Sequence, residues 1–341
     1  MKLTELTKEL CALGGPSGFE SAVFARIEEY VRPFADEIKT DPLGNFMAVK
    51  RCGRPGAKRI LMDAHMDEIG LIVTAVEDGF LRFAPLGGVD ARMLPGREVR
   101  VMGEKALFGV IDTMPPHLLS EGEQDKTIPL EKLRIDIGMT QEEAEKLAPP
   151  GTPVVYAEGC TELGDSQLCG KALDDRSCAA IIIKAFEELS AKELNVDVCL
   201  QISTQEEISG YRGAEVATRT MAPDYAIVVD VTHAKTPDAG DVTLAGRKGP
   251  AIGVGPNMNR AMTRAILDVA AEKGIPCQVE VCPGGNSGTN ASAVQISRGG
   301  VATTLVSLPL KYMHTPVETV WIEDMENILR LIVEYIGGME G

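Results

Sequence analysis

The chain has 341 residues, enough for one large domain or two moderate ones with a sizeable hydrophobic core. Its composition, 44% hydrophobic and 25% charged, is typical of a soluble globular enzyme. The net charge of −16 argues against nucleic acid and anionic membrane surfaces as partners, because both attract basic patches.

The start of the chain, MKLTELTKELCALGGPSG, indicates an amphipathic helix followed by a Gly-Pro-Ser turn, and not a signal peptide. No apolar run approaches the roughly 18–20 residues that span a bilayer. The eight cysteines form no CxxC pair and suggest no disulfide framework, so we expect them to be reduced. These features predict a cytoplasmic protein without a membrane segment.

Residues 1–35 have a helical pattern, and strand-like runs follow at 45–50 and 59–64. The second run is short and apolar, and it ends in the polar cluster HMDE (65–68). A buried strand that delivers catalytic groups at its carboxyl end has this pattern.

Between residues 71 and 163 the pattern changes to short β-like segments at 71–76, 80–83, 98–102, 108–112 and 153–156. Glycines and prolines separate them, as at Gly87-Gly88 and Pro149-Pro150. This texture predicts a small all-β, barrel-like module, with a partly helical stretch at 128–147.

Beyond Gly170 strands and helices alternate. We expect helices at 176–191, 214–220, 260–273 and 322–336, a helix start at 290–296, and strands at 196–203, 225–231, 278–282 and 303–307. Alternation predicts an α/β fold with a mixed central sheet and helices on both faces. We expect residues 1–70 and 165–341 to form one discontinuous catalytic domain, with 71–164 inserted as a β domain.

His65 and Asp67 form an H-x-D pair just past a strand. Residues i and i+2 of an extended segment face the same way, so the carboxylate can accept the second ring N–H of a metal-bound histidine. We interpret His65 as a metal ligand and Asp67 as its partner. Taken alone, the pair is a weak signal, because such pairs occupy surface or core positions more often than metal sites.

Two acidic pairs follow. Asp174 and Asp175 precede a helix and could be no more than an acidic helix start, although Asp174 is the natural bridging carboxylate among the other motifs. Glu206 and Glu207 end an apolar strand, where burial is costly unless a cation is present. One of these glutamates can bind metal while its neighbour stays free, and the alternative is a solvated turn.

Asp230 closes the apolar run AIVVD (226–230), and His314 follows the apolar strand at 303–308. Two other histidines compete for a role. His117 lies in the inserted module, where we expect a structural role, and His233 either contacts substrate or is a bystander.

Taken together, the motifs supply the ligand set of a two-metal hydrolase. Two metals need about four to six nitrogen or oxygen side chains and one carboxylate that bridges them. An acidic residue left without metal must move protons. The order of the motifs along the chain covers each of these roles.

The motifs HMDEIG (65–70), ALDDR (172–176), QEE (205–207), VVDVT (228–232) and YMHTPVE (312–318) resemble those of the M42 family of metallo-aminopeptidases. This family includes tetrahedral and glutamyl aminopeptidase-like enzymes. GPSGFE (15–20), GGVDARMLPGREV (87–99) and GTNAS (288–292) also fit, so the resemblance covers nearly the whole chain.

The resemblance implies a di-zinc peptidase fold holding two divalent metals, zinc or cobalt, with manganese as a further alternative. Asp174 would bridge both metals. His65 and Asp230 would complete one metal site, and Glu207 and His314 the other. A cis peptide between Asp174 and Asp175 is common in related enzymes.

It also implies that Glu206 is the general base, that Asp67 orients His65, and that the inserted β module mediates dimers that often assemble into dodecamers. The expected function is a two-metal aminopeptidase that hydrolyses the N-terminal residue from peptides through metal-activated water. The alternatives are a related di-metal deacylase or carboxypeptidase and a glycosidase. A single Trp and 4% aromatic residues make a sugar-stacking cleft the weakest of these.

Two departures from the family pattern bear on substrate preference. Many relatives read QEEVGLRGA where this chain has the longer QEEISGYRGA (205–214), and many have Asp where Asn290 stands.

Overall fold

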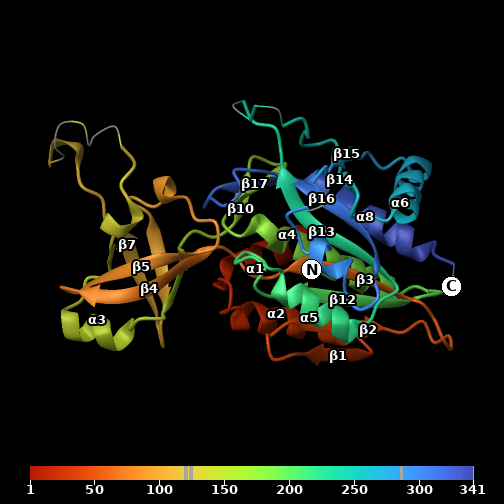
Figure 1. The fold of residues 1–341 in the computed structure, drawn as a ribbon, viewed down its shortest axis with the longest axis horizontal. Coiled ribbons are helices and arrows are strands. Elements are labelled where there is room, and N and C mark those ends of the chain that lie inside the picture. Colours follow the sequence, from red (N-terminus) through yellow and green to blue (C-terminus); the bar gives the residue numbers. More distant parts are fainter. Residues whose placement is uncertain (119–121, 123–125, 238, 241, 285–286, 341) are drawn as a thin grey trace.

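The computed structural model describes residues 1–118, 122, 126–237, 239–240, 242–284 and 287–340. It contains a large mixed sheet and a separate closed barrel, which lies at one end of the long axis in Figure 1. The predicted α/β fold with an inserted β-barrel is therefore confirmed. None of the described helices is long and apolar enough to cross a membrane.

The large sheet has the order β1-β2-β12-β3-β13-β16-β17-β11-β10, with β14 paired to β16 and β15. Its strands are β1 (Glu37–Thr40), β2 (Phe46–Lys50), β3 (Arg59–His65), β10 (Thr161–Leu163), β11 (Gln167–Gly170), β12 (Asp197–Ser203), β13 (Tyr225–His233), β14 (Ala251–Val254), β15 (Gln278–Val281), β16 (Ala302–Lys311) and β17 (Glu318–Trp321). The four central strands β12, β3, β13 and β16 are parallel. Their carboxyl ends therefore meet at one edge, which is where ligands bind in sheets of this kind.

Helices cover both faces of this sheet. One face packs against α1 (Leu3–Ala12), α2 (Ser21–Val31), α4 (Leu173–Ser190), α6 (Arg260–Lys273) and α8 (Ile322–Gly337), and the other against α5 (Arg212–Met221) and α7 (Ala291–Val294). Alternate residues of β3 divide between the two cores: Ile60 and Met62 join the first and Leu61 the second. This is the alternation that an extended chain imposes.

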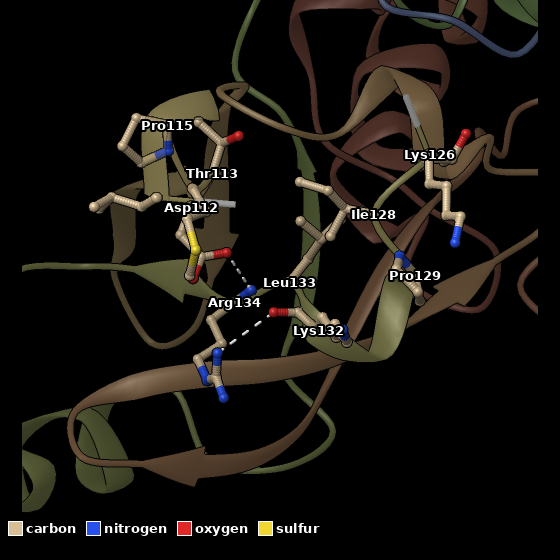
Figure 2. A pocket seen from close by; sticks show the side chains of 12 residues that line it. Asp112, Thr113, Pro115, Lys126, Ile128, Pro129, Lys132, Leu133 and Arg134 are labelled. Atoms are coloured by element: carbon tan, nitrogen blue, oxygen red, sulfur yellow. Dashed lines mark hydrogen bonds between the residues drawn. The ribbon is translucent and has the colours of Figure 1, made fainter. Parts of the chain in front are cut away.

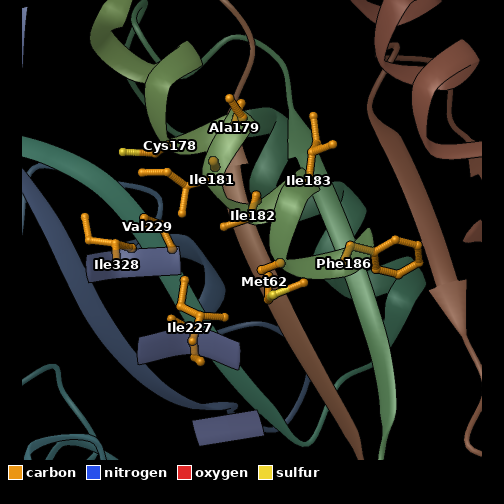
Figure 3. Close-up of a cluster of buried hydrophobic side chains, with 14 of the residues drawn as sticks. Met62, Cys178, Ala179, Ile181, Ile182, Ile183, Phe186, Ile227, Val229 and Ile328 are labelled. Atoms are coloured by element: carbon orange, nitrogen blue, oxygen red, sulfur yellow. The ribbon is translucent and has the colours of Figure 1, made fainter. Parts of the chain in front are cut away.

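Helix α4 is the centre of the larger core. Its side chains Ile182 and Phe186 pack with Met62 of β3, Ile227 of β13 and Ile328 of α8 (Figure 3). Fourteen of the eighteen residues of α4 are buried, so the packing around this helix is what stabilises it. Its first turn is thereby fixed beneath the carboxyl ends of the parallel strands.

The barrel closes in the order β4-β5-β8-β7-β6-β9. Its strands and helix are β4 (Gly70–Glu77), β5 (Phe80–Leu86), β6 (Glu98–Met102), β7 (Ala106–Ile111), β8 (Ile135–Asp136), α3 (Gln141–Leu147) and β9 (Pro153–Tyr156). Three 3-10 turns accompany them, η2 (Ala91–Met93), η3 (Pro116–Leu118) and η4 (Leu130–Lys132). A fourth turn, η1 (Arg32–Phe34), follows α2 outside the barrel. The barrel has its own core, which includes Leu81, Val101 and Ile135. The expected helical character at 128–147 corresponds to η4 and α3.

Several short strands differ from the sequence expectation. Strands β1, β10, β11, β14 and β17 are each three or four residues long and were not expected. All three residues of β10 are exposed, so no alternation marks it. This strand lies inside the expected insertion at 71–164 but pairs with β11 in the large sheet.

A candidate two-metal centre

The carboxyl-terminal parts of three strands bring the predicted ligands together. His65 is the last residue of β3, and residues 205–207 follow the end of β12 after one intervening residue. Asp63 of β3 pairs with Val228 of β13. His65 and Asp230 each lie two residues further along these parallel strands, so they are neighbours. Parallel neighbouring strands thus place these side chains at one edge of the sheet.

The first group of candidate ligands consists of His65, Asp174 and Asp230. Their ligand atoms all lie within 4.8 Å of one another, and all three residues are buried. His65 Nε2 lies 3.2 Å from Asp174 Oδ1. Imidazole and carboxylate ligands at this spacing suit a divalent transition metal.

The second group consists of Asp174, Glu207 and His314, again with ligand atoms within 4.8 Å of one another. His314 Nε2 lies 3.4 Å from Asp174 Oδ2 and 3.2 Å from Glu207 Oε2. The two groups share Asp174, whose Oδ1 faces His65 and whose Oδ2 faces His314. A carboxylate with one oxygen toward each histidine has the arrangement of a bridging ligand.

Glu206 lies beside the cluster and belongs to neither group. Its Oε2 is 3.9 Å from His65 Nε2. Burial raises the pKa of Glu206 to about 9, and the negative charges of Asp230 and Glu207 add to this effect against the opposing His65. The residue is thus a buried acid next to the candidate ligands, as proton transfer requires.

The charges of the cluster are unbalanced without a cation. Burial raises the pKa of Asp230 well above its usual value, and Asp174 and Glu207 push it further despite His65. Although burial alone would lower it, contacts with Asp174 and Glu207 raise the pKa of His314 to about 11. Cations at this position would relieve these shifts, and the donor set of carboxylates and imidazoles fits two divalent ions.

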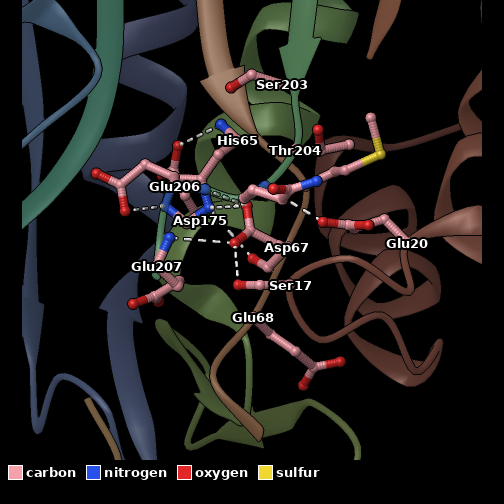
Figure 4. Close-up of polar contacts among 12 residues, drawn as sticks. Ser17, Glu20, His65, Asp67, Glu68, Asp175, Ser203, Thr204, Glu206 and Glu207 are labelled. Carbon is pink, nitrogen blue, oxygen red and sulfur yellow. Dashed lines mark hydrogen bonds and ion pairs between the residues drawn. The ribbon is translucent and has the colours of Figure 1, made fainter. Parts of the chain in front are cut away.

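Asp67 supports the cluster from behind (Figure 4). Its carboxylate accepts the backbone amides of Glu206 and Glu207, each at 3.1 Å, and the hydroxyl of Ser17 at 2.5 Å. Asp67 Oδ1 also lies 3.3 Å from His65 Nδ1. Burial would raise the pKa of Asp67, but His65 and Ser17 outweigh burial and keep it low. One carboxylate therefore orients both a candidate ligand and the candidate base.

Two supporting carboxylates were missed by sequence reasoning. Glu318 is buried and accepts the backbone amides of Asp174 at 3.0 Å and His314 at 2.9 Å. Asp175 accepts the backbone amide of His65 at 3.3 Å, and its peptide bond with Asp174 is cis, as the resemblance implies. Glu318 closes the motif YMHTPVE, which was the available signal.

A buried ionic group anchors the amino-terminal loop beneath the site. Glu68 contacts Lys171 Nζ at 2.8 Å and Arg176 Nη2 at 3.0 Å, and it accepts the backbone amide of Gly15 at 3.0 Å. Arg176 also donates to the carbonyl oxygens of Leu10 in α1 and Gly15 in the loop. Charges this deeply buried need such complete pairing, and their position fixes the loop to the end of β3.

The barrel also reaches the site. Its loop glycine Gly88 packs against His314, and a Cβ added at Gly88 would lie 2.5 Å from His314 Nδ1. His314 itself has a left-handed backbone, with φ of 61°. Strained positions of this kind persist only where surrounding contacts hold them.

A cavity of about 420 Å³ opens onto the cluster, lined by the described residues Asp174, Glu206, Glu207, Ser209, Tyr211, Asp230, Val231, Thr232, His233, Glu280, Ser287, Gly288, Thr289, Met313 and His314. A larger cavity of about 680 Å³ lies in the barrel between residues 112–118 and 126–134 (Figure 2). None of the candidate metal ligands lines this larger cavity, so the smaller cavity is the candidate active site. His233 lines the smaller cavity, whereas His117 lies on the exposed turn η3.

Asn290, which stands where many family members have Asp, is buried and does not line this cavity. Its side-chain amide donates to Asp63 Oδ2 at 2.9 Å and to Ser203 Oγ at 2.8 Å. The residue therefore bears on the packing of β3 and β12 behind the site.

Comparisons with known proteins agree with this geometry. A family model described as M42 glutamyl aminopeptidase matches residues 44–331. A lysyl aminopeptidase from Pyrococcus furiosus is 37% identical over 334 residues, covering 96% of this chain and 94% of that protein.

Two solved structures are similar throughout. A TET aminopeptidase from a marine sediment archaeon of the Thaumarchaeota has a TM-score of 0.92 at 32% identity, covering 100% of this chain and 98% of that chain. The Pyrococcus horikoshii TET1 peptidase, described as assembling into a tetrahedron or a large octahedral shell, has a TM-score of 0.87 at 34% identity, covering 99% and 100%.

Proposed function

Because this chain belongs to the M42 glutamyl aminopeptidase family and is therefore a peptide hydrolase, we propose that it removes N-terminal residues from peptides with two divalent metal ions. The observation that carries the proposal is Asp174, whose two carboxylate oxygens face His65 and His314 at 3.2 and 3.4 Å. A single shared carboxylate between two ligand groups is what a two-metal centre needs.

In this proposal His65, Asp174 and Asp230 hold one ion, and Asp174, Glu207 and His314 hold the other. Zinc, cobalt and manganese are the candidate metals, because nitrogen and carboxylate ligands suit all three. The ions would supply Lewis acidity to the scissile carbonyl and acidify water. Asp67 and Glu318 keep the ligands in place through the backbone amides that they accept.

Glu206 is the proposed general base. Its carboxyl group lies next to His65 without belonging to either ligand group. In the proposed reaction Glu206 takes a proton from water and returns it to the leaving amine. The free amino group of the peptide would bind at the same centre, which confines cleavage to one end. The family model and the lysyl and glutamyl aminopeptidases among the relatives do not favour the deacylase, carboxypeptidase or glycosidase alternatives.

Assembly and location belong to the same proposal. We propose that residues 71–164, apart from β10 in the large sheet, form a dimerisation domain, with 1–70 and 165–341 as the catalytic domain, and that dimers assemble further, up to a dodecamer. Exposed apolar side chains on the barrel, including Phe108, Met114 and Leu118, support an interface there. Peptides are the proposed substrates and the cytoplasm the proposed location.

The test is hydrolysis of aminoacyl-p-nitroanilides, unblocked and N-acetylated, by metal-stripped enzyme with zinc, cobalt or manganese added back. We expect metal-dependent cleavage of unblocked substrates only. Release of acetate from the acetylated series would instead identify a deacylase, and activity that ignores metal would overturn the two-metal proposal.

A further inference from the structure

Glu280 is the acidic side chain of the active-site cavity that the proposed metal centre leaves unused. Five acidic residues line this cavity among the described residues, and three of them are candidate ligands. The fourth, Glu206, is the candidate base. Glu280 comes from a different part of the fold, the edge strand β15, and it is half-buried.

A threonine fixes the Glu280 carboxylate beside the centre. Thr232 Oγ1 donates a hydrogen bond to Glu280 Oε1 at 2.5 Å, and Thr232 is itself buried. Thr232 and Asp230 lie two residues apart on β13, so their side chains share one face of the strand. Two residues of a strand advance about 6–7 Å, which sets the spacing between Asp230 and the Thr232–Glu280 contact.

Among the described lining residues, four other acidic side chains accompany Glu280, against two histidines. No lysine or arginine lines the cavity in the part of the chain that the structure describes. The basic lining residues there are His233, at the exposed end of β13, and His314, which faces Asp174 and Glu207. A carboxylate in this position attracts a cationic side chain and repels an anionic one.

We propose that Glu280 determines substrate specificity by binding the side chain of an N-terminal lysine or arginine. This inference rests on the proposed aminopeptidase function, which places the peptide's α-amino group at the metal centre. The long aliphatic stem of either side chain reaches from that centre toward Glu280. Met313, which also lines the cavity and is only partly buried, provides an apolar contact for such a stem.

The test compares kcat/KM of the metal-loaded enzyme on unblocked Lys-, Arg-, Leu- and Glu-p-nitroanilide. The wild type should prefer Lys and Arg to Leu, and Leu to Glu. In Glu280→Gln, which keeps the side-chain size and an acceptor for Thr232, the Lys-to-Leu ratio should fall about 10- to 100-fold, the effect of losing one charged hydrogen-bond partner. Glu280→Lys should reverse the order of Lys and Glu.

Glu272→Gln, the same substitution at an exposed residue of α6, is the matched control and should keep the wild-type ratio. An equal loss on Lys and Leu substrates in Glu280→Gln would show that Glu280 binds the α-amino group or only supports the fold, and would overturn the proposal. A wild type without preference for cationic residues would overturn it too. Neither result affects the proposed function, which fails only if unblocked substrates as a class are not cleaved in a metal-dependent way.

Discussion

The Oδ1 atom of Asp67 accepts a hydrogen bond from the backbone amide of Glu206 at 3.1 Å. The same carboxylate holds the amide of Glu207 through Oδ2 and lies against the ring of His65. A single buried side chain thus sets the relative positions of a candidate base and two candidate ligands.

Asp67→Asn should therefore lower activity and metal affinity by about 10- to 100-fold, as substitutions behind metal ligands do. In the wild type, Ser17 and two backbone amides all donate hydrogen bonds to the Asp67 carboxylate. In the variant, the side-chain NH₂ group would face one or more of these donors, and those hydrogen bonds would be lost. Kinetics and calorimetric metal titration measure the effect. Asp268→Asn, at an exposed ion pair on α6, serves as control. Unchanged kinetics and affinity in Asp67→Asn would contradict the assigned role.

Glu206→Gln should retain both metal ions and lose turnover by about 10²–10⁴-fold, the usual contribution of a general base. Glutamine is nearly the same size and cannot take up the proton. Metal content by elemental analysis and kcat on an unblocked substrate give the two readouts. A variant that stayed fully active would show that another group moves the proton.

Gly88→Ala should weaken activity although Gly88 belongs to the barrel. A methyl group there would meet His314 Nδ1 at 2.5 Å, so the ring must move away from Asp174 and Glu207. We expect higher KM and lower metal affinity with little change in folding, measured by metal titration and thermal unfolding. Gly159→Ala tests the same substitution at a glycine whose φ is not positive and whose added Cβ would meet no atom within 4 Å. If the two variants had the same KM and metal affinity, the contact between Gly88 and His314 would have no role in activity.

Metal-free protein should lose stability as the pH rises from 6 to 9. The pKa of Glu206 is raised from 4.5 to about 9 by burial, and that of His314 from 6.5 to about 11 by Asp174 and Glu207 against burial. A group whose pKa is raised by folding contributes stability that is complete below its unfolded pKa and is lost as the pH rises through the folded value. Each such group changes the free energy of unfolding by at most about 1.4 kcal/mol per pH unit while it titrates.

Urea unfolding with a chelator at several pH values measures this slope. Added zinc should flatten it, because metal replaces the protons. In Glu206→Gln the free energy of unfolding should fall less steeply with pH, because Glu206 no longer titrates. Stability of the metal-free protein that rises with pH in this window would contradict the charge balance described for the cluster.

Much of the site could be predicted from the sequence because each candidate ligand has a local signal. His65 ends β3, Glu207 follows the apolar strand β12 within four residues, Asp230 closes the apolar run 226–230 of β13, and Asp174 opens a helix. Parallel strands end at one edge, so chain order alone indicates that these side chains meet. The short strands β1, β10 and β14 lacked such a signal, since four residues or fewer show no clear alternation.

The sequence by itself determined the type of fold, the family motifs and the residues able to bind metal, because these depend on side-chain chemistry and on periodicity along the chain. Only the tertiary structure decided which groups surround them. Glu318 acts on Asp174 from 144 residues away, Gly88 reaches His314 from the barrel, and Glu280 meets Thr232 from an edge strand. Such contacts arise from the packing of separate elements, and no local pattern encodes the distance between two atoms far apart in the chain.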